Sequence, residues 1–256
     1  MIYDKLPIVL LSTMASERKD STNNEIARFL LSHYEEVKNL GISELAKVCH
    51  VSNSSISRFC KEIGLEGFAE LKELLTTTNF YFERQSLKNN SLQRLQENAN
   101  LVKKSIEQVE KSVNMEAIIS LCEDIRYYQN ISSFGLLKAE TVAMNFQSDM
   151  LMLGKQVYTS VSFQHQLDHI LSANSDELII IFSYTGSYFE TNNFRGKKNQ
   201  LRKPKIWMIT GQKKDFPDYI DRIIYFESDH NQGSHPYQLQ FIESLIAQEY
   251  AKGLEL

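Results

Sequence analysis

The sequence predicts an all-α N-terminal domain followed by an α/β domain, in which a five-stranded parallel sheet is flanked by helices. Its 256 residues, 42% of them hydrophobic, are enough for one small and one medium core. Two short amphipathic helices joined by a tight turn lie between Gly41 and Leu75. From about residue 130, strand and helix patterns alternate at the spacing of βαβ units. These three observations favour two domains over one.

The first short helix is predicted from an N-cap and a narrow apolar face. Ser43 is a good N-cap, and Leu45, Ala46 and Val48 follow at helical spacing. His50 stands in the turn, where a glycine is usual in a helix-turn-helix. Two short helices that cross at the small Ala46 are therefore expected.

The second short helix is predicted to run from Asn53 to Ile63, with Ser52 as its cap and Gly64 as a left-handed stop. Small polar side chains near its N-terminus allow close approach to base edges in a major groove, and cations further along suit guanine or phosphate. The predicted DNA contacts are Lys47, Ser52, Asn53, Ser54, Ser55, Ser57, Arg58 and Lys61. From periodicity alone, a packing helix with a solvated polar face explains the pattern about equally well.

The charge of the chain limits how tightly such a helix pair could bind DNA. The chain has a net charge of -4, and its first 78 residues carry nine Lys or Arg against eleven Asp or Glu. This balance argues against strong non-specific DNA binding, because phosphate attraction depends on positive charge. We therefore expect a dimer that concentrates positive charge locally and reads a palindromic operator.

A long helix with a narrow apolar seam follows the helical pair. The seam consists of Leu92, Leu95, Ala99, Val102, Ile106, Val109 and Val113. It indicates pairing with a second copy or, as the favoured choice, packing on the following domain. The polar segment before it is the candidate hinge, so the predicted domains are 1–76 and 91–256, with a linker at 77–90.

The α/β domain is predicted from five apolar runs, at Asn130–Phe134, Gln156–Thr159, Glu177–Ser183, Lys205–Thr210 and Arg222–Phe226. Ligands of parallel sheets bind where strand ends meet helix starts, which indicates the loops after Phe134 and Phe182. The second loop, Ser183 to Ser187, offers hydroxyls and a glycine to a phosphate. An ordinary structural turn would have the same composition.

The run ISELAKVCHVSNSSISRFCKEIGLEGFAELK resembles the N-terminal helix-turn-helix domain of the RpiR family of bacterial sugar-responsive transcription regulators. The likeness extends over about the first 76 residues and includes the core from Val51 to Phe59. Residues from about Met115 to Ala251 resemble the sugar isomerase (SIS) domain that follows in this family. The resemblance implies double-stranded DNA and a phosphosugar effector as partners, in a homodimer or higher homo-oligomer.

The SIS resemblance implies a ligand site in two turns, which this chain keeps in part. The implied ligand residues are Gly135, Lys138, Ser183, Thr185, Gly186 and Ser187. Leu137 and Ala139 replace a glycine and a serine of the first turn, and Tyr188 replaces a threonine of the second. His235 stands where an arginine is usual. An SIS domain that has lost its ligand and serves as a dimerisation scaffold is therefore an alternative.

An enzymatic function is the least favoured interpretation of the sequence. Isomerisation of a phosphosugar needs a positioned base and acid, and no spacing commits His165, His169, His230 or His235 to either role. We expect no catalytic residue, no metal and no cofactor, with Cys49, Cys60 and Cys122 as buried thiols. The sequence lacks an apolar run of membrane-spanning length and a signal peptide, which predicts a cytoplasmic protein.

Overall fold

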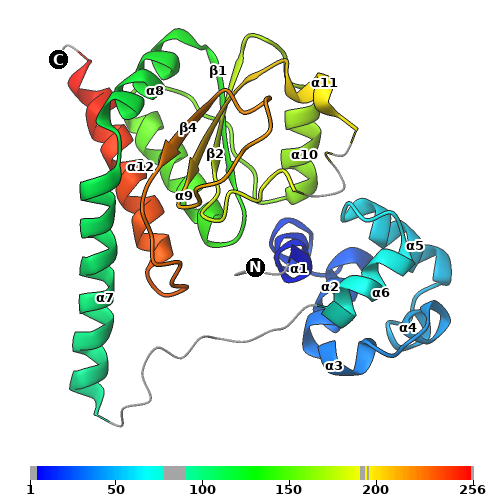
Figure 1. Cartoon of the computed structure of the whole chain (residues 1–256). Coiled ribbons are helices and arrows are strands. Elements are labelled where there is room, and N and C mark those ends of the chain that lie inside the picture. Colours follow the sequence, from blue (N-terminus) through cyan, green and yellow to red (C-terminus); the bar gives the residue numbers. More distant parts are fainter. Residues whose placement is uncertain (1–4, 78–89, 191–193, 195, 255–256) are drawn as a thin grey trace. The chain divides into compact units, whose positions relative to one another are not determined.

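The computed structural model describes residues 5–77, 90–190, 194 and 196–254 of the chain (Figure 1). These residues divide into two compact units. The N-terminal unit comprises residues up to 77 together with 160–168, and the α/β unit comprises the other described residues from 90 onward. The predicted linker falls largely on residues 78–89, which lie outside the described residues. None of the described helices is both long and apolar enough to cross a membrane.

The N-terminal unit is helical, as predicted. Its helices are α1 (Lys5–Ser16), α2 (Thr22–Ser32), α3 (Tyr34–Val37), α4 (Ile42–Val48), α5 (Asn53–Glu62) and α6 (Phe68–Thr77). One core joins them, with fully or almost fully buried Ile26, Leu30, Leu45, Ile56 and Phe59. The buried Tyr34 hydroxyl donates to the Leu75 carbonyl at 2.7 Å, which ties α3 to α6. A small domain with few long helices depends on such long-range contacts.

The elements from residue 91 onward alternate between helices and strands. They are α7 (Ser91–Ser112), α8 (Met115–Tyr127), β1 (Asn130–Gly135), α9 (Lys138–Met152), α10 (Phe163–Ser172), β2 (Glu177–Phe182), α11 (Lys198–Leu201), β3 (Lys205–Thr210), β4 (Arg222–Tyr225) and α12 (His235–Lys252). Helix α9 packs on β1 and β2, and α12 packs on α7, α8 and α9. Residues 178–182 of β2 are completely buried, as expected of a strand covered on both faces.

The sheet has four parallel strands in the order β1-β2-β3-β4, so the prediction of five strands is wrong. The missing strand is Gln156–Thr159, in which Tyr158 alone forms a bridge, to Ser132 of β1. Ser133 N donates to the Tyr158 carbonyl and Tyr158 N donates to the Ile131 carbonyl, both at 2.8 Å. The apolar pattern of this segment reflects the burial of Val157 at the sheet edge, with too few backbone bonds for a strand.

The four strand ends form one edge of the sheet. Gly135 at the end of β1 pairs with Phe182 at the end of β2, and Phe182 pairs with Ile209 near the end of β3. The two predicted ligand loops therefore begin at the same level of neighbouring strands. This register, set by the hydrogen-bond ladder, positions the candidate site.

Helix α7 divides into two halves with different surroundings. In its C-terminal half, Ser105 and Val109 are buried against the α/β unit, so that the favoured prediction holds there. In its N-terminal half, Leu92 and Leu95 are 68% and 64% exposed. Figure 1 shows this half extending past the neighbouring α12. The apolar seam is therefore covered along only part of its length.

A carboxyl group is buried between α9 and α12. Glu243 is fully buried, and its Oε2 accepts hydrogen bonds from Asn145 Nδ2 at 2.9 Å and Gln240 Nε2 at 2.6 Å. Its Oε1 is buried without a hydrogen-bond partner in the described residues. Burial, with a smaller effect from the Asp149 charge, raises the pKa of Glu243 to about 7 and outweighs the opposing Asn145 bond.

Candidate functional sites

The α4-turn-α5 motif has the geometry of a helix-turn-helix, with one corrected cap. Helix α4 begins after Gly41, whose N–H donates to Glu44 Oε2 at 2.7 Å, so the prediction of Ser43 as the N-cap is wrong. Ser52 caps α5 as predicted, accepting from Ser55 N at 3.1 Å. Gly64, with a φ of 86°, ends α5 in the left-handed conformation.

The turn between the two helices holds His50 in a left-handed conformation, with a φ of 55°. Val51 N closes the turn by donating to the Ala46 carbonyl at 2.9 Å, and Ala46 is buried where the helices cross. A side chain other than glycine is disfavoured at this φ, so the surrounding packing maintains the turn. The unusual His50 therefore does not disrupt the motif.

The N-terminal turn of α5 presents a connected group of polar side chains. The Ser52 hydroxyl lies 2.7 Å from that of Ser54 and 2.9 Å from that of Ser55. Asn53 is exposed, and its Nδ2 donates to Ser43 Oγ at 3.0 Å, which fixes the amide against α4. Ser57 is half-buried, whereas Lys47 on α4 is exposed. The predicted contacts at the start of α5 thus lie together and face outward.

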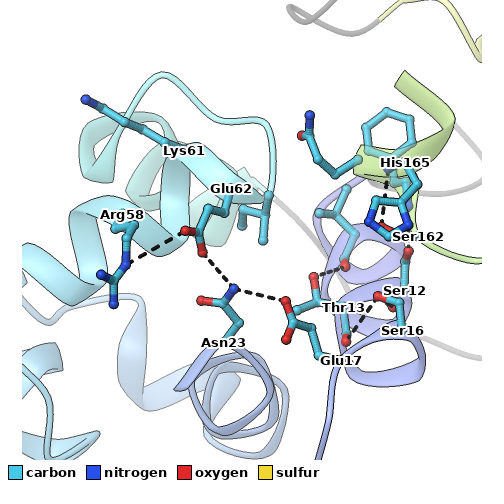
Figure 2. Close-up of a pocket in the computed structure, with 14 residues that line it drawn as sticks. Ser12, Thr13, Ser16, Glu17, Asn23, Arg58, Lys61, Glu62, Ser162 and His165 are labelled. Carbon is cyan, nitrogen blue, oxygen red and sulfur yellow. Dashed lines mark hydrogen bonds and ion pairs between the residues drawn. The ribbon is translucent and has the colours of Figure 1, made fainter. Parts of the chain in front are cut away.

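Arg58 and Lys61 occupy the later turns of α5 and have different surroundings (Figure 2). Arg58 Nε lies 3.8 Å from Glu62 Oε1, and Glu62 Oε2 accepts from Asn23 Nδ2 at 2.7 Å. The same amide donates to Glu17 Oε1 at 3.2 Å. Lys61 extends away from this group in Figure 2. Glu62 follows Arg58 by four residues in α5, whereas the sequence gave no sign of Asn23 and Glu17, which lie outside this helix.

The cysteines of the chain have the environments of buried thiols. Cys60 and Cys122 are buried, and burial raises their pKa values to about 11 and about 12. Cys49 is half-buried, and burial raises its pKa to about 11. Thiols with raised pKa are poor nucleophiles and poor metal ligands at neutral pH. Within the described part of the chain, no cluster of His, Cys, Asp or Glu could hold a metal ion.

The first predicted ligand loop is closed around Gly135. A Cβ at this position would lie 2.4 Å from the Ala139 carbonyl oxygen, so the start of α9 presses on the strand end. Leu137 precedes α9 with a φ of 55°, and Lys138 Nζ donates to the Gln232 carbonyl at 3.0 Å. Of the predicted residues here, Gly135 is buried in a tight contact and Lys138 alone exposes a charge.

The second predicted ligand loop is a turn closed by Gly186, whose N–H donates to the Ser183 carbonyl at 2.8 Å. The Thr185 and Ser187 hydroxyls lie 2.6 Å apart. A Cβ on Gly186 would lie 2.8 Å from Phe216 and 3.2 Å from Lys214 Cε. Lys214 Nζ is 3.5 Å from the Thr185 carbonyl and pairs with Glu190 at 2.6 Å. Sequence reasoning missed Lys214, since only the fold places it beside this turn.

His235 stands between the two loops. Its ring centroid lies 4.3 Å from that of Tyr184, and it is buried at the start of α12. Burial and then the nearby Lys138 charge lower the pKa of His235 to about 4, so the ring is neutral at pH 7. The structure thus brings Lys138, Tyr184 and His235 together at the strand ends. Tyr188, which replaces the family threonine, is instead part of the buried core.

Comparison with known proteins assigns the N-terminal unit to a family. Residues 8–78 match the profile "Helix-turn-helix domain, rpiR family". A regulator of Providencia stuartii, "Uncharacterized HTH-type transcriptional regulator in aarA 3'region", is 24% identical over 72% of this chain and 69% of its own length. The regulator TTE0211 of Caldanaerobacter subterraneus is 26% identical over 64% of this chain and 60% of its own length.

A solved structure with a similar fold covers both units. The Vibrio vulnificus NanR protein complexed with ManNAc-6P has a TM-score of 0.53 and 13% identity, over 96% of this chain and 91% of that one. At this identity the likeness establishes the fold alone. Together with the helix-turn-helix geometry of α4 and α5, the profile match shows that the N-terminal unit is a helix-turn-helix domain of the rpiR family, and the relatives in sequence are HTH-type transcriptional regulators.

Proposed function

We propose that this protein is a dimeric regulator of carbohydrate metabolism genes that binds a palindromic operator and responds to a phosphorylated sugar. Residues 1–76 would read DNA, 77–90 would link the domains, and 91–256 would bind the effector and join the two copies. The observation that carries this proposal is the N-terminal turn of α5, where Ser52, Asn53 and Ser54 are exposed together on a matched helix-turn-helix. An exposed polar helix start suits a major groove.

A dimer would bind the operator more tightly than a single copy of the chain. The acidic residues around α5 weaken phosphate attraction by a single copy, and two half-sites read together would multiply the binding. The exposed Leu92 and Leu95 on α7 support the dimer, because they continue the same seam that is buried further along the helix. A second copy of α7 is the proposed cover for these leucines.

The effector would bind at the strand ends of the α/β unit. Lys138 and Lys214 can attract a phosphate, while the turn from Ser183 to Ser187 offers hydroxyls and backbone amides. The similar fold of a NanR protein that is complexed with ManNAc-6P supports a sugar phosphate as the ligand class. Differential binding to two arrangements of the dimer would then change operator affinity.

Selection of duplex DNA from a random pool by the purified full-length protein tests the proposal. We expect a site with two-fold symmetry, whose affinity changes when ManNAc-6P, glucose 6-phosphate or another sugar phosphate is added in a gel-shift titration. Failure to enrich a symmetric site would contradict DNA reading by a dimer. An unresponsive complex across the sugar panel would contradict only the effector.

A scaffold without ligand is the second candidate for the α/β unit. It is favoured by the closed first loop, where Ala139 presses on Gly135, and by Phe216 lying against Gly186. A thermal-shift screen separates the candidates, because a bound sugar phosphate must stabilise the fold by mass action. Isomerase activity is disfavoured by the regulator relatives, and turnover of a sugar phosphate by the pure protein would reverse that view.

A further inference from the structure

A chain of side-chain hydrogen bonds joins the second ligand loop to α7. The Tyr184 hydroxyl lies 2.5 Å from Ser228 Oγ, and Ser228 Oγ donates to Gln238 Oε1 at 2.6 Å. Because Ser228 uses its only hydroxyl hydrogen on Gln238, the Tyr184 hydroxyl is the donor in the first bond. Gln238 Nε2 then donates to the Ser105 carbonyl of α7 at 2.9 Å.

Three of the four members of this chain are buried, and Ser228 is half-buried. Tyr184 is 4% exposed, while Gln238 and Ser105 are 0% and 3% exposed. Hydrogen bonds at such burial are costly to leave unmade, so a shift of one partner requires the others to follow. Burial also raises the pKa of Tyr184 to about 12, which keeps its hydroxyl a donor at neutral pH.

The β4-α12 loop that carries Ser228 is also the anchor of α7. Asp229 accepts from Lys104 Nζ at 2.5 Å and from Gln108 Nε2 at 2.8 Å. Glu227 N donates to Ser112 Oγ at 2.8 Å. Lys104, Gln108 and Ser112 are spaced by four residues, so one face of α7 rests on this loop. Movement of the loop would therefore move α7.

The other end of the chain is fixed to the ligand loop. Tyr184 lies between Ser183 and Thr185, and its carbonyl accepts from Gly211 N at 3.1 Å and Thr210 Oγ1 at 3.2 Å. Its backbone is thus held by the end of β3, while its side chain reaches the β4-α12 loop. A ligand that reorganises Ser183 to Ser187 would displace the Tyr184 hydroxyl.

We infer that Gln238 is a positioning residue, which couples the loop from Ser183 to Ser187 to α7 through Tyr184 and Ser228. Helix α7 is the first described element after the helices of the N-terminal unit, so its position can report the state of this loop to the DNA-binding helices. This regulatory role rests on the proposed function. The mechanical coupling within the α/β unit does not.

Amide hydrogen exchange on the full-length protein tests the coupling without DNA or sugar. In Tyr184→Phe, which keeps the ring on His235 but removes the hydroxyl, we expect exchange near Ser105 in α7 to accelerate about fivefold, the effect of one lost hydrogen bond. Gln238→Met, which breaks the bond to α7 directly, should produce at least the same acceleration. Tyr237→Phe is the matched control, because this phenol on α12 is 49% exposed.

Acceleration confined to residues around 184 in Tyr184→Phe, with α7 unchanged, would overturn the coupling. If Gln238→Met fails to fold, Tyr184→Phe still decides the question. On a selected operator, Gln238→Met, which lies outside the ligand loop, should keep DNA binding but lose the response of the parent protein to a sugar phosphate. An unresponsive parent would contradict the proposed effector, while the exchange result would still decide the coupling.

Discussion

Arg58 and Glu62 form an ion pair along one face of α5, with 3.8 Å between Arg58 Nε and Glu62 Oε1. Asn23 and Glu17 extend this pair into a group that reaches α2 and the residue after α1. The carboxylates reduce the attraction of Arg58 for phosphate in general, and the pair holds its guanidinium near the helix. We therefore expect the selectivity of DNA binding to depend on where Arg58 is held more than on the total charge of the N-terminal unit.

Replacement of Glu62 should therefore change DNA selectivity. In Glu62→Gln we expect affinity for scrambled duplex to rise roughly two- to fivefold, because an exposed carboxylate no longer opposes phosphate binding. Affinity for the selected operator should rise less, so the ratio between the two falls. Fluorescence titration at two salt concentrations measures this ratio. Glu73→Gln on α6 is the control, and an unchanged ratio in Glu62→Gln would contradict the role of the pair.

The left-handed turn predicts an unequal response to substitutions at His50. His50→Asn should leave stability within about 0.5 kcal/mol, since asparagine tolerates a positive φ. His50→Val should destabilise the N-terminal unit by roughly 1–2 kcal/mol, because a β-branched side chain clashes there. Urea unfolding of both variants measures the difference. Equal stability of the two would show that the turn relaxes without cost.

The close contact between Gly135 and the Ala139 backbone predicts that alanine at residue 135 destabilises the α/β unit, whereas alanine at an open glycine does not. Gly135→Ala places a Cβ against the Ala139 backbone and should cost roughly 1–3 kcal/mol through overpacking. Gly67→Ala is a control in open space, where no heavy atom lies within 4 Å. Thermal unfolding should show a clear loss for the first variant and almost none for the second. An unchanged unfolding temperature of Gly135→Ala would show that the start of α9 moves away from residue 135 without loss of stability.

Local patterns in the sequence predicted the helices of the reader and four strands with little error. Ser52, Gly64 and the apolar face of α5 act through neighbours in the chain, so their roles follow from spacing. Tyr158 shows the limit, because pairing at a sheet edge depends on tertiary geometry that periodicity does not contain. Lys214 was likewise hidden, since only the tertiary fold brings it to the second ligand loop. The roles of the predicted site residues remain predictions.

The buried Glu243 predicts a pH dependence of stability. Its pKa is about 7 in the folded protein and about 4.5 when unfolded, so the folded state binds more protons between these values. Stability conferred by the protonated carboxyl is complete below pH 4.5 and is lost as pH rises through 7. Glu243→Gln should therefore stabilise the protein on the order of 3 kcal/mol at pH 8 and have little effect at pH 4 to 5.

Denaturant unfolding across pH 4 to 8 measures that effect, with the exposed Glu110→Gln on α7 as the control. His235 acts in the opposite sense, because its pKa of about 4 makes stability fall as pH drops from 6.5 to 4. Below pH 6.5, the stability of Glu243→Gln should therefore fall more steeply with decreasing pH than that of the parent protein. Parallel profiles for the variant and the parent would show that Glu243 is not protonated in the fold.

Helix α7 is held at Lys104, Gln108 and Ser112, so a small tilt there would displace its N-terminal end by a larger distance. From Ser91 to Lys104 the helix extends about 20 Å beyond its last clamped turn, at 1.5 Å per residue. A tilt of about 10° about Lys104 would displace the N-terminal end by roughly 3–4 Å on this length. A tilt that shifts the clamped turns by less than the length of one hydrogen bond would thus move the N-terminal end of α7 by nearly the length of one residue.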